Sequence, residues 1–286
     1  MFITHTEKDV NEFAVIFARV VQLTHGVPIK RMGWDRDHSL KRRVLKTIRG
    51  LVWGEYFRVF VSARKTEMLF ASAFRCDESR IASTGYPRND VLREPDKFSH
   101  PLVADDFQTP FGDEDRIIGY LPTFRMFETP PFYEEIDFGR INDALADTDY
   151  KFLVKPHPGT SPPSIDDYDN VYQTNESIDI YPHLARFDAL VSDYSSVALD
   201  YAVLHRPLIH FVYDRDAYER NRGFYFDLDE ILPGIQVEGG DEFVEVIKEV
   251  ATRADSQREQ RSRSEFVRHE GLASEEIVAE LISAEG

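Results

Sequence analysis

The segment from Phe187 to Asp214 constrains the fold of this chain more than any other, because it has the pattern of a strand, a turn, a helix and a second strand. Residues 189–191 are a short apolar run between polar residues, typical of a strand buried on both faces of a parallel sheet. A polar turn precedes an apolar-periodic helix, and Pro207 ends that helix before another apolar run at 208–212. This unit predicts an α/β fold.

The turn of this unit contains Asp193, Ser195 and Ser196. The first turn of a helix leaves backbone N–H groups unpaired and carries partial positive charge, and two serine hydroxyls add further donors. The turn is therefore a candidate phosphate or diphosphate site. The alternative is that Asp193 or Ser195 only caps the helix, as these residue types often do.

Composition restricts the compartment and the class of partner. The single cysteine, Cys76, excludes an intrachain disulfide and a Cys-rich metal site, and it fits a reducing compartment. No apolar run has the length of a signal peptide or a membrane span, so we expect a cytoplasmic protein. The net charge of −17 argues against non-specific binding of nucleic acid.

Positive charge is concentrated near the N-terminus, where residues 1–65 hold thirteen Lys or Arg against six Asp or Glu. Apolar residues between positions 40 and 51 fall at helical spacing, so residues 38–50 are expected to form an amphipathic basic helix. This helix could lie on an anionic membrane or face a phosphate-rich acceptor. The alternative is a core helix with a solvated basic face.

Short apolar runs alternate with helical stretches on both sides of a polar segment, residues 95–115, which we take as a linker. The alternation predicts two α/β domains with mainly parallel sheets, residues 1–112 and 113–286. Strands are expected at 19–24, 57–61, 81–84, 117–121, 152–155 and 171–173, and helices at 64–74, 136–146, 180–186, 243–251 and, in several pieces, 253–284.

Ligands of parallel sheets bind beyond the carboxyl ends of the strands. Five predicted turns in that position carry polar or charged groups: His25–Gly26, Arg88–Asp90, Thr123–Arg125, His157 and Asp193–Ser196. We expect these turns to meet in one cleft, which favours the phosphate interpretation of the serine turn over capping alone.

Seven pieces of the chain follow one another in a characteristic order: LTHGVPIKRMG (23–33), GYPRND (85–90), YLPTFR (120–125), FLVKPHP (152–158), VSDYSSVALDYAVLHRPLIHFVYD (191–214), RGFYFDLDEILPG (222–234) and FVRHEGLASEEI (266–277). Together they resemble the CDP-glycerol glycerophosphotransferase family, the teichoic-acid primases and polymerases. The resemblance implies a GT-B-like architecture, with two Rossmann-type domains facing a cleft. It also implies transfer of glycerol phosphate, or a related polyol phosphate, from CDP-glycerol to a hydroxyl of a lipid-linked or polymeric acceptor, with release of CMP.

The chain departs from the family pattern in two places. The family commonly has Trp-His-Gly-Thr where this chain has Thr24 to Val27, which alters the surroundings of His25. Family members also carry a longer N-terminal domain than the roughly twenty residues that precede this turn, so we expect a shortened acceptor-side domain.

The resemblance implies that His25 and His157 are the essential histidines. His25 suits the role of base because an imidazole titrates near neutrality, and His157 suits a contact with the diphosphate. A lone histidine at a strand end is otherwise more often structural. The other residues expected to bind the CDP-polyol are Gly26, Arg88, Asp90, Thr123, Arg125, Pro158, Asp193, Ser195, Ser196, Asp200, Arg222 and Gly223.

Several alternatives stay open at this point. Arg125 and Arg222 could make only salt bridges, and Asp193 is expected to orient its turn rather than to bind a metal. No HExxH, GxGxxG or P-loop motif occurs, so no metal or cofactor is expected. Other possible functions are a GT-B glycosyltransferase that uses a nucleotide sugar, and a degenerate protein that binds a nucleotide or glycan without catalysis.

Overall fold

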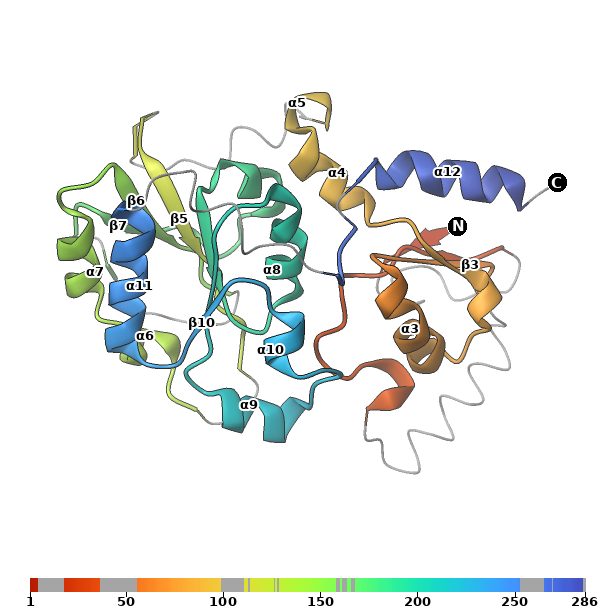
Figure 1. Cartoon of the computed structure of the whole chain (residues 1–286), viewed down its shortest axis with the longest axis horizontal. Coiled ribbons are helices and arrows are strands. Elements are labelled where there is room, and N and C mark those ends of the chain that lie inside the picture. Colours follow the sequence, from red (N-terminus) through yellow and green to blue (C-terminus); the bar gives the residue numbers. More distant parts are fainter. Residues whose placement is uncertain are drawn as a thin grey trace. The chain divides into compact units, whose positions relative to one another are not determined.

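A computed structural model gives the fold of the chain (Figure 1). The residues that it describes are 1–4, 18–36, 56–98, 111–112, 114–125, 127, 129–157, 160, 164–165, 168–252, 265–268 and 270–284. The chain forms two compact units, the first made of residues 1–90 and 265–286 and the second of residues 91–264.

The first unit contains a parallel sheet in the order β1-β2-β3-β4. Its strands are β1 (Phe2–Ile3), β2 (Val21–Gln22), β3 (Arg58–Val61) and β4 (Ile81–Ser83). Its helices are η2 (Gly33–Asp35), η3 (Arg64–Thr66), α3 (Glu67–Phe74), η4 (Glu78–Arg80) and α12 (Ala273–Ser283), where η marks a 3-10 helix. α4 (Pro87–Arg93) runs from this unit into the next, where α5 (Pro95–Phe98) follows it.

Alternation along β3 explains the layers of the first unit. Val59 and Val61 pack with Phe70 of α3, whereas Phe60 packs with Ile277 of α12. Because successive side chains of a strand point to opposite faces, α3 and α12 cover opposite faces of this sheet (Figure 1). The last helix of the chain therefore completes the first unit.

The second unit contains a parallel sheet of six strands in the order β10-β9-β8-β5-β6-β7. The strands are β5 (Arg116–Tyr120), β6 (Tyr150–Val154), β7 (Val171–Gln173), β8 (Ala189–Ser192), β9 (Leu208–Phe211) and β10 (Ile235–Val237). The helices are α6 (Phe132–Glu135), α7 (Phe138–Leu145), η5 (Tyr181–Arg186), α8 (Ser196–Tyr201), η6 (Ala202–Leu204), α9 (Arg215–Arg222), α10 (Leu228–Ile231) and α11 (Gly240–Thr252).

Helices cover both faces of this sheet, as buried apolar strands require. α7 and α11 pack side by side over one face, where Tyr120, Phe152 and Phe243 belong to the core, and α8 lies on the opposite face (Figure 1). Close packing on the α8 side depends on Gly119 of β5, because a Cβ there would stand 2.4 Å from the ring of Phe187. No helix within the described part of the chain is both long and apolar enough to span a bilayer.

The structure confirms the parallel α/β fold and corrects the predicted domain boundary. The division falls after Asp90 rather than near Gly112, and residues 265–286 return to the first unit instead of ending the second. The expected strands and helices occur with shifted ends, and the helix expected at 180–186 is the 3-10 helix η5 (Tyr181–Arg186). The expected basic helix at 38–50, most of the linker and residues 253–264 lie outside the described residues.

One buried carboxylate attaches the last helix to the first unit. Leu272, the residue before α12, makes no side-chain cap. Instead Asp90, which is 1% exposed, accepts hydrogen bonds from the backbone N–H groups of Ala273 and Ser274, both at 2.8 Å. Arg268 adds a bond to the carbonyl of Ser83 at 3.2 Å.

We therefore expect Asp90→Ala to lower the free energy of unfolding by about 1–2 kcal/mol, because two N–H groups at the helix start lose their acceptor. Urea unfolding followed by circular dichroism measures this loss. Glu78→Ala, at an exposed acid of the same unit, is the control and should leave the midpoint unchanged. Equal stability of Asp90→Ala and the parent would contradict the capping role.

Candidate functional site

The connections of the second unit diverge at β5. β6 and β7 follow on one side of β5, whereas β8 returns on its other side. In open parallel sheets a ligand crevice forms at such a switch point, beyond the carboxyl ends of the strands. The diverging segments here are residues 121–125, after β5, and the turn 193–196, after β8. This topology favours a ligand site at these two segments.

The turn before α8 is held by its own side chains. Ser192 Oγ donates to the carbonyl of Leu121 at 3.2 Å, which joins the ends of β8 and β5. Ser195 is the N-cap of α8, and its Oγ accepts a hydrogen bond from the N–H of Val197 at 3.4 Å. Capping by Ser195 is thus observed. Ser195 and Ser196 are both half-buried, and their contact with a phosphate stays a prediction.

The guanidinium of Arg125 lies between two buried carboxylates at the carboxyl edge of the sheet. Its Nε and Nη2 donate to Asp214 at 2.9 and 3.0 Å, and its Nη1 donates to Asp193. The side chains of Arg125, Asp193 and Asp214 are 9%, 0% and 3% exposed. Because these residues follow β5, β8 and β9, the ion pairs join three neighbouring loops.

Asp193 receives further hydrogen bonds from the β5 loop. The backbone N–H of Thr123 donates to Asp193 Oδ2 at 2.9 Å, and the Thr123 hydroxyl donates to Oδ1. Burial disfavours the ionised form, but the Arg125 charge and the Thr123 bonds outweigh burial and lower the pKa of the Asp193 carboxyl. Asp193 is therefore an anion that orients the turn.

Three tyrosine rings enclose the Arg125 guanidinium. Its Cζ lies 5.3, 5.2 and 5.1 Å from the ring centres of Tyr194, Tyr213 and Tyr218. Burial raises the pKa of all three phenols, so they stay neutral, and the Tyr194 hydroxyl donates to Asp214 at 3.1 Å. Two carboxylates thus match the Arg125 charge and aromatic rings surround it. These contacts favour a structural role for Arg125, and its binding of the donor phosphates stays a prediction.

Two other predicted ligands are used inside the fold. Asp200 of α8 is 0% exposed and accepts a hydrogen bond from the Tyr181 hydroxyl at 2.7 Å, which joins α8 to η5. Asp90 holds the start of α12, as described above. Both carboxylates are structural groups, because burial and backbone or phenol donors occupy them. Their burial and internal partners favour this structural role, and binding of the donor by either residue stays a prediction.

His157 stands at the carboxyl end of β6 and is exposed. Its ring stacks on Phe124 of the β5 loop, with ring centres 5.3 Å apart and planes inclined by 26°. Its carbonyl accepts hydrogen bonds from the N–H and the hydroxyl of Thr160 at 3.0 and 2.8 Å. This position of His157 suits a contact with a ligand at the carboxyl edge of the sheet. Pro158, the next predicted residue, lies outside the described residues.

Arg222 and Gly223 end α9. Gly223 has a φ of +64°, and its N–H donates to the carbonyl of Glu219 at 2.9 Å, so the glycine terminates the helix. Arg222 is half-buried beside Tyr218, whose pKa it lowers against the larger effect of burial. Binding of the donor by these two residues stays a prediction.

The remaining predicted residues belong to the first unit. His25 is exposed on the turn after β2, between Thr24 at φ +56° and Gly26 at φ +118°. The Thr24 hydroxyl donates to the carbonyl of Phe60 at 3.1 Å and holds this turn on β3. Arg88 lies over the ring of Tyr86 at 4.5 Å. The expectation that His25 shares a crevice with the serine turn stays a prediction.

The sequence analysis missed Asp214, a partner of Arg125, and Lys155, a cation at the same edge of the sheet. Asp214 and Lys155 each follow a strand directly or within three residues, and that position is the signal that could have found them. His210 was also passed over. Its Nε2 lies 2.9 Å from the carbonyl oxygen of Pro233 and its Nδ1 3.3 Å from that of Asp193, so it supports the back of the serine turn.

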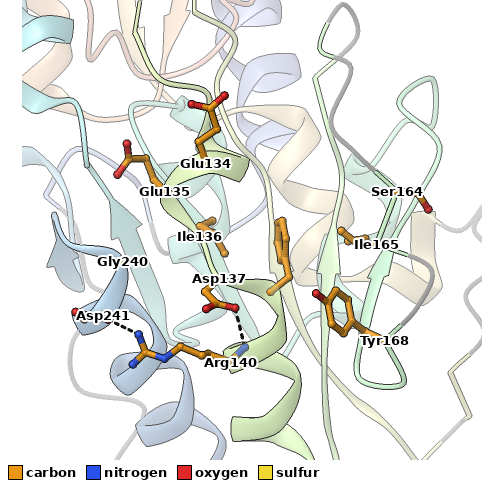
Figure 2. A pocket seen from close by; sticks show the side chains of 11 residues that line it. Glu134, Glu135, Ile136, Asp137, Arg140, Ser164, Ile165, Tyr168, Gly240 and Asp241 are labelled. Atoms are coloured by element: carbon orange, nitrogen blue, oxygen red, sulfur yellow. Dashed lines mark hydrogen bonds and ion pairs between the residues drawn. The ribbon is translucent and has the colours of Figure 1, made fainter.

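A pocket of about 670 Å³ opens at the starts of α7 and α11 (Figure 2). It contains none of the predicted ligands, and its walls carry the carboxylates of Glu134, Glu135, Asp137 and Asp241. Arg140, the one cation among its described lining residues, is paired with Asp241 (Figure 2). Such walls repel a phosphate, so this pocket is a poor candidate for the donor. Among the described residues, no three His, Cys, Asp or Glu side chains gather closely enough to hold a metal ion.

Comparison with known proteins gives one consistent family. The model of the family described as CDP-glycerol:poly(glycerophosphate) glycerophosphotransferase matches residues 14–283. The teichoic acid poly(ribitol-phosphate) polymerase of Bacillus spizizenii is 32% identical over 248 aligned positions, and the match covers 81% of this chain and 38% of that protein. The teichoic acid glycerol-phosphate transferase of Staphylococcus aureus is 33% identical over 253 aligned positions, and the match covers 85% of this chain and 64% of that protein.

Comparison with solved structures gives the same family as comparison of the sequences. The structure of the wall teichoic acid polymerase TagF matches 93% of this chain and 68% of its own, with a TM-score of 0.71 and 25% identity. The predicted GT-B-like α/β fold is therefore confirmed. This chain spans less than two thirds of the length of the two relatives above.

The ion pairs of Arg125 generate a prediction about stability. Arg125→Met leaves Asp193 and Asp214 buried without their counter-charge, so we expect the free energy of unfolding to fall by about 3–5 kcal/mol. Urea unfolding measures it. Arg140→Met, which removes an exposed ion pair of the same unit, is the control and should change the midpoint little. A variant of Arg125 as stable as the parent would show that these ion pairs do not hold the loops.

Proposed function

The chain belongs to the CDP-glycerol:poly(glycerophosphate) glycerophosphotransferase family, and from this premise we propose that it transfers a polyol phosphate from a CDP-polyol to a hydroxyl group. The donor is CDP-glycerol or a related CDP-polyol such as CDP-ribitol. The acceptor is a lipid-linked or polymeric glycopolymer of the teichoic-acid or capsular type, and CMP is released.

The family match over residues 14–283 carries this proposal. Three further observations support it. Relatives named for glycerol-phosphate and ribitol-phosphate transfer cover most of this chain. A variant of TagF, whose fold this chain shares, has been solved after a soak with CDPG. Both histidines that the resemblance implies are exposed at carboxyl ends of strands.

The proposed reaction exchanges one P–O bond for another. The acceptor oxygen forms a bond to the phosphorus that carries the polyol, and the bond from this phosphorus to the bridging oxygen of CMP breaks. His25 takes the proton of the acceptor hydroxyl, and His157 contacts the diphosphate. The N–H groups at the start of α8, with Ser195 and Ser196, bind phosphate oxygens, while Asp193 orients their turn.

Release of CMP tests this function. The parent is expected to release CMP from CDP-glycerol or CDP-ribitol in the presence of an acceptor, and His25→Ala and His157→Ala should each slow it by about a hundredfold or more. The control is His205→Asn, at the opposite end of the sheet of the second unit, where a φ of +55° is one that Asn tolerates. This control should keep the parental rate.

Other outcomes separate the alternatives. Binding of CDP-glycerol without turnover would favour a degenerate binding protein. Release of UMP or UDP from a uridine-linked sugar would favour a glycosyltransferase. Parental rates in both histidine variants would contradict the proposed mechanism.

We also propose that the protein acts at the inner face of the cell membrane, with residues 38–50 contacting anionic lipid. The support is the concentration of Lys and Arg in this part of the sequence, since each basic residue near an anionic surface contributes about 1 kcal/mol. The triple variant Lys41→Gln, Arg42→Gln, Arg43→Gln should therefore sediment less with phosphatidylglycerol vesicles than the parent. Equal sedimentation, or equal binding to neutral phosphatidylcholine vesicles, would contradict membrane contact through this segment.

A further inference from the structure

Because Arg125 is ion-paired with two carboxylates, the carboxyl edge of the second unit has little unmatched positive charge near the serine turn. Arg125 carries one positive charge, and its partners Asp193 and Asp214 carry two negative charges. Arg215, which follows β9, is paired with Asp227 and Asp229 at 3.2 Å each. A diphosphate bound here would meet a net negative cluster unless further cations took part, and the described candidates are Arg222, at the end of α9, and Lys155.

Lys155 stands at this edge with its backbone held in place. It directly follows β6, and its N–H donates to the carbonyl of Tyr120 at 3.0 Å. Tyr120 pairs with Val154 of β6 and with Val191 of β8, so Lys155 and Ser192 stand level at the edge of the sheet. One strand separates them, which corresponds to about 10 Å between their backbones. This is a span that a diphosphate and a lysine side chain can bridge.

Lys155 is half-buried, and its surroundings within the described part of the chain leave its ammonium without a contacting anion. Among the described residues no hydrogen-bond acceptor or carboxylate contacts its Nζ. Burial lowers the pKa of Lys155, and the more distant charges of Asp179 and Glu176 oppose that effect. A partly desolvated cation without a contacting anion is unfavourable in the free protein, and a bound anion relieves this.

Lys151, on the same strand, is a lysine whose ammonium has a hydrogen-bond acceptor. It lies four residues earlier in β6, and its Nζ donates to Asn170 Oδ1 at 2.7 Å. The two lysines share the strand, and only Lys155 stands at the carboxyl edge. The difference between them is therefore one of position and partner rather than of residue type.

We propose that Lys155 binds the diphosphate of a nucleoside-diphosphate donor, with its ammonium on the phosphate oxygens opposite the start of α8. This inference rests on the proposed function and deepens it, because it assigns to Lys155 the charge that the sequence suggested for Arg125. The same contact stabilises the leaving nucleoside monophosphate, whose negative charge grows by one as the bond to the bridging oxygen breaks.

Calorimetric titration with CDP and with CMP tests the assignment. Lys155→Met should weaken CDP binding by about tenfold to a hundredfold, as expected for loss of a charge-assisted hydrogen bond, and CMP binding by less. Lys155→Arg should restore part of the affinity because it keeps the charge. The matched control Lys151→Met should bind CDP as the parent does.

A purely structural role of Lys155 makes a different prediction. Removing a partly desolvated charge that has no contact partner should not destabilise the fold, so the melting temperature of Lys155→Met should equal or exceed that of the parent. A lower melting temperature together with equal weakening of CDP and CMP binding would assign Lys155 to the structure and overturn the proposal.

The remaining outcomes distinguish this inference from the proposed function. Parental CDP affinity in Lys155→Met would overturn the inference, even if CMP release from CDP-glycerol proceeds. Lys155-dependent CDP binding without CMP release from any CDP-polyol would support the inference and contradict the proposed transfer. Failure of the parent to bind either CDP or inorganic pyrophosphate would overturn both.

Discussion

The buried ion pairs of Arg125 are the constraint on which the candidate site depends. They join the loops that follow β5, β8 and β9, and so they set the spacing of the segments that surround the switch point of the sheet. Buried ions are costly unless charge and hydrogen bonds match them. Here two carboxylates and Thr123 provide the match, and three tyrosine rings surround the guanidinium. The cluster is therefore a scaffold for a ligand site.

The polar groups at the carboxyl edge of the sheet are of two kinds. Charges that are already matched hold the loops, whereas the groups that can meet an anion are the N–H groups at the start of α8, the exposed His157 and the half-buried Lys155. Asp193 belongs to the first kind, although it lies two residues from Ser195. A candidate ligand-binding residue is therefore better judged by the hydrogen-bond and ion-pair partners of its side chain than by its place in a motif.

Local patterns predicted the parts of the structure that local forces produce. The runs at 189–191 and 208–212 became β8 and β9 because continuous apolar sequence is what a doubly covered parallel strand requires. Ser195 became the cap of α8 for a local reason as well. β10 escaped prediction because its three residues include Gln236 and have no apolar run.

The side-chain contacts that the sequence could not supply depend on pairs of residues far apart along the chain. Arg125 meets Asp214 across 89 positions, and Asp90 meets Ala273 across 183. Each is a charged residue in a segment whose sequence predicts a polar turn, which is also how a ligand-binding residue looks in sequence. Both patterns arise because the carboxyl ends of parallel strands gather loops from distant segments. Which charged side chains are paired with one another therefore has to be taken from the folded structure. A cation such as Lys155 is recognised as a candidate for binding a ligand only once the ion-paired cations have been identified.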